Sequence, residues 1–220
     1  VAIVGAGGLG APAALYLAAA GVGRLRLIDD DTVALSNLQR QVIFTTADVG
    51  VPKTEAAATA LNALNPHVGI ETRSTRLTPG NAHALLEGAD VVLDGTDDFS
   101  TRFAVNAAAR ALNTPLVSGA VGRWNGQVSV FAAPGPCYRC FVPEAPPDAE
   151  TCAAVGIVGA LTGVIGAMMA LEAIKLIAEA GAPLAGRILL FDGLQGEART
   201  VSLKRDPACP ICSNEVCGHE

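Results

Sequence analysis

The chain opens with a glycine-rich turn that restricts the folds open to it. Residues 1–4 form a short apolar run that predicts a buried strand, and Gly5-Ala6-Gly7-Gly8-Leu9-Gly10 follows directly. An alanine-rich helix, a second strand over Arg24–Ile28 and the acid Asp29 complete the unit. Glycines in such a turn let the backbone approach a pyrophosphate at a helix N-terminus. This order of elements is typical of a dinucleotide-binding α/β fold.

The rest of the chain continues the alternation of strands and helices. The last strands alternate apolar and polar residues, which indicates antiparallel neighbours with one solvated face. We therefore expect one domain over residues 1–220, with a doubly wound, mostly parallel Rossmann-like sheet and antiparallel C-terminal strands. A Pro-rich stretch over 134–147 is predicted to be a loop. Further strands are expected at 68–73, 90–94, 115–118, 127–131, 187–191 and 199–204, and helices at 52–64, 79–87 and 99–112.

Composition argues against several classes of partner. Half of the residues are hydrophobic and 16% are charged, so a large core is expected. The net charge of −6 disfavours nucleic acid, whose phosphates require many cations. Residues 153–171 are uncharged, but they are rich in Gly and Ala and run on into Glu172 and Lys175, which predicts a core helix rather than a membrane span. We expect a cytoplasmic protein, because no secretory signal precedes Val1, and a natural N-terminus upstream of that residue.

Polar residues beyond the glycine turn suit a triphosphate. Asn37 and Arg40 are three residues apart, which places them on one face of a helical turn. Lys53 is predicted in the first turn of a helix, where the macrodipole disfavours a cation unless an anion lies nearby. Asp97 follows a buried strand, at the edge where such sheets bind ligands, and a carboxylate there can hold Mg²⁺. Taken singly, these could be surface residues or a helix N-cap; taken together with the turn, they favour ATP.

Two Cys-x-x-Cys pairs can supply four thiolates. In a chain without a secretory signal such pairs favour metal or redox chemistry over structural disulfides. We expect a tetrahedral structural zinc that clips the Pro-rich loop to the C-terminal segment, with a thioredoxin-like redox role as the alternative. The expected ligands are Cys137, Cys140, Cys209 and Cys212.

Four ordered motifs resemble those of the ubiquitin-activating-type adenylyltransferases. The resemblance is greatest to the bacterial enzymes that activate the sulfur carriers of molybdopterin and thiamine biosynthesis. It implies ATP- and Mg²⁺-dependent adenylation of the C-terminal Gly-Gly carboxylate of a ubiquitin-like sulfur-carrier protein, with release of pyrophosphate. The motifs are Val4-Gly5-Ala6-Gly7-Gly8-Leu9-Gly10, Leu35-Ser36-Asn37-Leu38-Gln39-Arg40-Gln41, Val49-Gly50-Val51-Pro52-Lys53 and Asp94-Gly95-Thr96-Asp97-Asp98.

The same resemblance implies roles for individual residues. Asn37, Arg40 and Lys53 would contact the phosphates, Asp97 the magnesium, and Asp98 the nucleotide. Arg102 and Asn106 share a helix face and are expected to orient ATP or the carrier tail. The two cysteine pairs would bind zinc. The full set expected to bind the nucleotide is Gly5, Gly7, Gly8, Gly10, Asp29, Ser36, Asn37, Arg40, Lys53, Asp97 and Asp98.

Cys152 is a separate candidate, just before the Gly-rich apolar helix. On the residues alone it is a small core residue. The resemblance makes it a candidate nucleophile for a second step, after adenylation, although in some family members a separate sulfur donor takes the adenylate instead. The family also implies a symmetric homodimer, with Gly159, Gly163 and Gly166 in the core or the dimer interface, and an N-terminal arginine that reaches the partner's site.

Two other functions share this fold. An NAD-dependent oxidoreductase would need a catalytic Lys, Tyr or His constellation, and the sequence presents none that is recognisable. A non-catalytic relative would be expected to lose Arg40, Lys53 or Asp97, and all three are present. Within the family, a member that adenylates another peptide or a tRNA base remains open, as do the identity of the carrier and of the sulfur donor.

Overall fold

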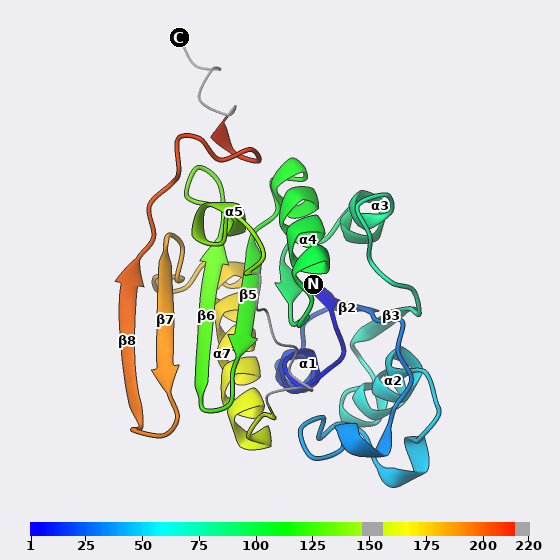
Figure 1. Cartoon of the computed structure of the whole chain (residues 1–220). Helices are drawn as coiled ribbons and strands as arrows, with labels where there is room; N and C mark the ends of the chain where they lie inside the picture. The colour runs from blue at the N-terminus through cyan, green and yellow to red at the C-terminus, as the bar shows by residue number, and fades with distance from the viewer. Residues whose placement is uncertain (147–155, 214–220) are drawn as a thin grey trace.

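An eight-stranded sheet crosses the whole described part of the chain, in the order β3-β2-β1-β4-β5-β6-β7-β8 (Figure 1). The computed structural model describes residues 1–146 and 156–213. Strands β1 to β5 pair in parallel, and β5 to β8 pair antiparallel. The predicted mostly parallel sheet with antiparallel C-terminal strands is therefore confirmed. The strands are β1 Ala2–Val4, β2 Arg24–Ile28, β3 Gly69–Arg73, β4 Val92–Asp94, β5 Leu116–Val121, β6 Asn125–Phe131, β7 Arg187–Asp192 and β8 Glu197–Ser202.

Helices cover both faces of the sheet, which gives three layers (Figure 1). Alternate strand residues enter different cores: Ile3 packs with α1, α2 and α7, whereas Val4 packs with α3, α4 and α5. Strands with both faces buried must be apolar at successive positions, which explains the continuous apolar runs of β1 and β4. The helices are α1 Gly10–Ala19, α2 Lys53–Leu64, α3 Ala82–Leu86, α4 Phe99–Ala111, α5 Tyr138–Phe141 and α7 Gly159–Ile177, with 3-10 turns at η1 Leu35–Asn37 and η2 Thr46–Asp48.

Two parts of the chain differ from the sequence-based expectation. The predicted loop over 134–147 contains α5, a single turn that follows Cys137 and includes Cys140, and it has no apolar period to reveal it. The core helix predicted from the uncharged run 153–171 starts at Gly159 and, as expected, runs on through Glu172 and Lys175 to Ile177. Glu172 is buried and accepts a hydrogen bond from the Leu184 backbone N–H at 2.7 Å. Its carboxylate also pairs with Lys175. The two charges are therefore part of the packing of this helix.

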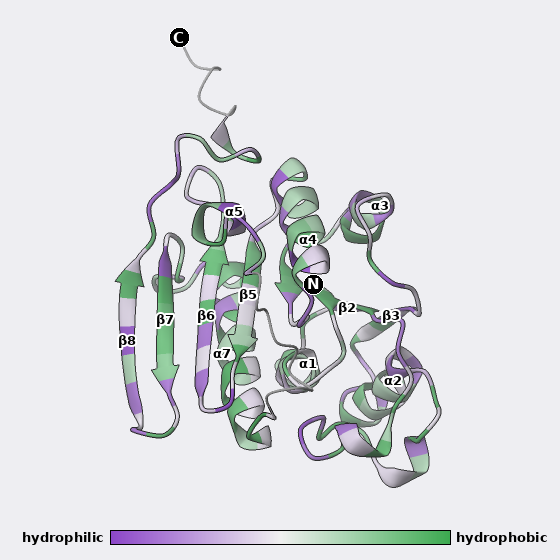
Figure 2. Ribbon diagram, viewed as in Figure 1, coloured by the Kyte–Doolittle hydropathy of each residue, from purple (hydrophilic) through white to green (hydrophobic). Residues whose placement is uncertain are grey.

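Helix α7 meets the length and composition criteria for a membrane span, and it is predominantly hydrophobic (Figure 2). It packs against α1, β5 and β6, in agreement with the predicted core helix. A side chain at Gly159 would lie 2.1 Å from the Gln39 carbonyl, and one at Gly166 would lie 2.5 Å from the Leu9 carbonyl. Both glycines thus serve contacts within the chain, whereas Gly163 faces open space.

The glycine turn is closely packed and conformationally demanding. Gly5 has a φ of +87°, a region that side-chain-bearing residues rarely adopt. A Cβ at Gly10 would lie only 1.8 Å from the Gly5 carbonyl oxygen. Asp29 at the end of β2 closes the turn, because its Oδ2 accepts the Ala6 N–H at 2.7 Å. The turn therefore joins β1, α1 and β2 at one point.

Asp98 is the N-cap of α4 and fixes where that helix begins. Its carboxylate accepts the backbone N–H groups of Ser100 and Thr101 and both of their hydroxyls. Burial raises the pKa of Asp98, but these hydrogen bonds outweigh burial and bring the pKa down to about 2. Asp97, the alternative N-cap, does not fill that role and is exposed.

The glycine turn yields a matched pair of variants. Gly10→Ala should lower the free energy of unfolding by about 3 kcal/mol, because the new methyl group overlaps a backbone carbonyl that cannot move away. Gly7→Ala should change it by less than about 1 kcal/mol, since its Cβ meets nothing closer than Gln41 Nε2 at 3.7 Å. Urea denaturation measures both. Equal destabilisation by the two substitutions would contradict the account.

The Asp98 cap predicts a pH-dependent stability. Asp98→Ala should cost about 1 kcal/mol at pH 7, the usual value of an N-cap. Because the folded pKa is depressed, the stabilisation is complete above the unfolded value of 3.8 and is lost as the pH falls through about 2. The gap between wild type and Asp98→Ala should therefore narrow between pH 4 and pH 2. Asn at position 98 is a cap that does not titrate, so the difference in unfolding free energy between Asp98→Asn and Asp98→Ala should stay constant over this pH range. A constant difference between wild type and Asp98→Ala would refute the assignment.

Candidate active site

A cavity of about 470 Å³ opens at the C-terminal ends of the parallel strands. It lies beside β1, where the strand order reverses, and such a switch point is where doubly wound sheets bind ligands. Two of the residues expected to bind the nucleotide, Gly10 and Ser36, do not line it. The expected residues that the structure does bring together there are Gly5, Gly7, Gly8, Asp29, Asn37, Arg40, Lys53, Asp97 and Asp98, and Arg102 joins them.

The two exceptions have other roles. Gly10 is required by its close approach to Gly5, so it is a packing residue of the turn. Ser36 is exposed, and its backbone carbonyl accepts a hydrogen bond from Arg40 Nη1 at 3.4 Å. Neither residue lines the cavity, so a part for Gly10 and Ser36 in nucleotide binding stays a prediction.

Asn37 and Arg40 lie on one helical turn, as predicted. The Arg40 N–H donates to the Asn37 carbonyl at 3.0 Å, just beyond η1. The Asn37 side-chain oxygen accepts the Ala34 N–H at 3.2 Å, and Asn37 lines the cavity, so its amide nitrogen can serve as a donor there. The turn therefore presents one amide and one guanidinium donor to the same space, a combination suited to phosphate oxygens.

The start of α7 holds this turn in place, a contact that the sequence did not reveal. Thr162 Oγ1 lies 3.3 Å from the Arg40 carbonyl and 2.7 Å from that of Gly159. The Thr162 methyl group also faces Gly8, where an added Cβ would lie 3.2 Å away. Because the two segments are more than a hundred residues apart, local sequence carried no signal of the contact.

Lys53 has an anionic partner, as its position in the first turn of α2 required. Its Nζ lies 2.7 Å from Asp31 Oδ2, and its backbone N–H donates to the Asp31 carbonyl. The Lys53 side chain is 6% exposed, whereas that of Asp31 is 67% exposed. The lysine charge thus sits at the base of the cavity with a partner that water can still solvate.

Asp29 combines a structural bond with a position in the cavity. Besides Ala6, its carboxylate accepts the Asp31 N–H at 2.8 Å. Burial raises the pKa of Asp29, and the nearby positive charge of Lys53 opposes that rise. Carboxylate oxygens have further lone pairs, so these two bonds leave acceptor capacity for a sugar hydroxyl.

Asp97 and Asp98 form an acidic edge of the cavity. Asp97 is exposed and lines it, with its carboxylate accessible to a cation. Asp98 is shared between the α4 cap and Arg76, whose Nη2 lies 3.1 Å from Asp98 Oδ2. Arg76 also lines the cavity and was not anticipated.

Arg102 and Asn106, expected to act together, serve different sites. Arg102 lines the cavity, but its guanidinium donates to the carbonyls of Thr96 and Gly119 and so braces the end of β4 against β5. Asn106 lies one helical turn further on, buried beside the cysteines. The expectation that Asn106 orients ATP or the carrier tail is not supported by its position.

Gln41 is a further cavity residue that was not assigned a role. The residue is 3% exposed, and its Oε1 has no hydrogen-bond partner among the described residues. A buried amide oxygen without a partner costs about 1–3 kcal/mol. The one feature of the sequence that pointed to Gln41 was its position directly after Arg40, at the end of the Leu35–Gln41 motif.

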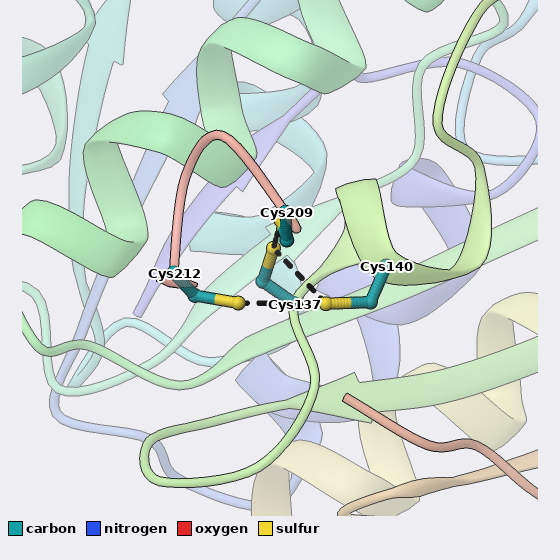
Figure 3. A group of neighbouring side chains, drawn as sticks. All are labelled: Cys137, Cys140, Cys209 and Cys212. Carbon is teal, nitrogen blue, oxygen red and sulfur yellow. Dashed lines mark hydrogen bonds between the residues drawn. The ribbon is translucent and has the colours of Figure 1, made fainter. Parts of the chain in front are cut away.

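Four cysteine sulfurs converge at the other end of α4 (Figure 3). All four Sγ atoms lie within 4.8 Å of one another, with 3.5 Å between Cys137 and Cys209 and 3.4 Å between Cys140 and Cys212. A tetrahedral zinc with bonds of about 2.3 Å separates its sulfurs by about 3.8 Å. The thiols are not joined as disulfides. The donor set and spacing fit a metal ion, whereas Cys152 lies outside the described residues.

Similarity to known proteins agrees with this geometry. The model of the ThiF family matches residues 1–211. A Thermus thermophilus sulfur carrier protein adenylyltransferase is 48% identical, over all of this chain and 84% of the relative. The Escherichia coli sulfur carrier protein ThiS adenylyltransferase is 46% identical, over 96% of this chain and 85% of the relative.

A solved structure supports the fold. The crystal structure of Escherichia coli MccB aligns with a TM-score of 0.86 at 23% identity, and the alignment covers all of this chain and 66% of MccB. The family match extends over nearly the whole sequence and includes the glycine turn, Arg40, Lys53, Asp97 and the first cysteine pair. The chain therefore belongs to the ThiF family.

Proposed function

We propose that this enzyme uses ATP and Mg²⁺ to adenylate the C-terminal Gly-Gly carboxylate of a ubiquitin-like sulfur-carrier protein, releasing pyrophosphate. The observation that carries the proposal is the cavity that gathers Arg40, Lys53 and Asp97 around the glycine turn. Adenylyltransferases that act on sulfur carriers are 46–48% identical over nearly the whole chain. The pathway served would be molybdopterin or thiamine biosynthesis.

The reaction joins two anions, and the site residues address that difficulty. A carboxylate oxygen of the carrier attacks the α-phosphorus, a new P–O bond forms, and the bond to pyrophosphate breaks. Arg40 and Lys53 would offset the charge of the phosphates and stabilise the charge that develops in the transition state. The turn and Asp29 would hold the triphosphate and the ribose.

Two metals have plausible ligands in this chain. Asp97 would hold Mg²⁺, a hard cation that prefers carboxylate oxygens and supplies Lewis-acid charge neutralisation when bound. The four-cysteine cluster would hold a structural zinc with all four positions filled by the protein. Unpaired thiols fit the reducing cytoplasm, where we place the enzyme.

The nucleophile is already ionised, so little proton transfer is needed in the first step. For a second step we propose Cys152, whose thiolate would attack the carbonyl carbon of the acyl-adenylate and release AMP, unless a separate sulfur donor does so. Pro146 is the last described residue before Cys152, and Ile157 is the second described residue after it; both line the cavity, which supports this assignment. We further propose a homodimer, to which exposed apolar residues of α7 such as Leu171 would contribute.

The test of the proposal is exchange of labelled pyrophosphate into ATP. With a Gly-Gly-ending carrier present, wild-type enzyme should catalyse exchange, and carrier lacking the terminal glycine should not support it. Arg40→Ala and Lys53→Ala should each reduce exchange by about 10²–10³-fold while remaining folded, because each removes charge stabilisation from the transition state.

The matched control is Arg24→Ala, at the opposite end of β2, which should leave the exchange rate unchanged. An enzyme that catalyses no exchange with any Gly-Gly-ending carrier would refute the proposal. Tight NADH binding together with indifference to ATP would instead support the oxidoreductase alternative.

A further inference from the structure

Asn106 is a buried polar residue that the adenylation chemistry does not use. It lies on α4, is 2% exposed, and contacts the cysteine cluster rather than the nucleotide cavity. Its Oδ1 accepts the Tyr138 backbone N–H at 2.8 Å, and its Nδ2 lies 3.7 Å from Cys137 Sγ. The two contacts are therefore to Cys137, the N-cap of α5, and to the first residue of α5.

The orientation of the Asn106 amide follows from its neighbours. A backbone N–H can only donate, so the amide oxygen must face Tyr138. With the oxygen facing Tyr138, the amide nitrogen is directed to the Cys137 sulfur. A thiolate accepts such a hydrogen bond, and a neutral donor is what a metal cluster with four anionic ligands needs in a buried site.

The position of Asn106 also links two parts of the molecule. Asp98 begins α4 at the cavity, and Asn106 lies two turns further along the same helix. Arg110, one turn beyond Asn106, donates to the Gly135 carbonyl at 3.3 Å, so the helix is attached to the cysteine-bearing segment at two points. Cys137 and Cys140 are thereby held relative to the helix that borders the cavity.

We propose that Asn106 is a positioning residue of the metal cluster, donating to the Cys137 thiolate while it fixes α5 through Tyr138. The inference rests on the proposed four-cysteine metal site. It assigns Asn106 to the metal in place of the role with ATP or the carrier tail that its helix position first indicated.

The test uses the full chain, loaded with zinc or with cobalt. Asn106→Leu removes the amide and keeps the approximate side-chain volume. Asn106→Ala also removes the amide but has a smaller side chain, and it serves as the second variant should Asn106→Leu fold poorly. Val105→Ala is the matched control, since Val105 is fully buried on the same helix but belongs to the apolar core. Zinc transfer to a coloured chelator and the thiolate-to-cobalt absorption band are the two readouts.

Both Asn106 variants should release zinc at least about 10-fold faster than wild type. Their cobalt band should move to longer wavelength, because the sulfur lone pairs rise in energy when the hydrogen bond is lost. Val105→Ala should lower stability without moving the band. Faster zinc release without a shift of the cobalt band, or no change in either readout, would overturn the role of Asn106 but not the metal site. A wild-type protein that takes up neither metal would overturn the metal site itself and this inference with it.

Discussion

The contact between Gly10 and the Gly5 carbonyl is the constraint on which the rest of the molecule depends. It sets how closely α1 approaches β1, and only a residue without a Cβ permits that distance. Helix α7 then packs over the same region, where Gly166 meets the Leu9 carbonyl and the Pro12 ring. Asp29 bonds the turn from β2. The base of the cavity is therefore built by backbone packing before any ligand contact is considered.

Charge at the site is arranged around this base. Lys53 is buried yet paired with an exposed acid, so its charge is retained at limited desolvation cost and remains available to an anion. Arg40 is held by its backbone, through Thr162, while the one hydrogen bond of its side chain to the described residues is a long contact with the Ser36 carbonyl. Such an arrangement fixes where the cations are without occupying all of their donors, which is the requirement for binding a triphosphate.

Sequence alone predicted the features that depend on local order. The glycine turn, the strands and the antiparallel end of the sheet follow from residue periodicity and spacing, and the cysteine pairs from their ligand chemistry. Contacts between distant segments escaped prediction. Spacing at i, i+4 placed Arg102 and Asn106 on one face of α4, but it could not show that one turn separates the cavity from the cysteine cluster. Thr162 and Gln41 were missed because their role depends on tertiary packing.

The central claim is that this turn and its cations hold ATP. The most direct measurement is a crystal structure of the chain with a non-hydrolysable ATP analogue and Mg²⁺. The account predicts the triphosphate in the cavity beside Gly7 and Gly8, with Arg40 and Lys53 on its oxygens and Asp97 at the metal. An analogue bound outside this cavity, or bound there with its phosphates directed away from Arg40 and Lys53, would contradict it.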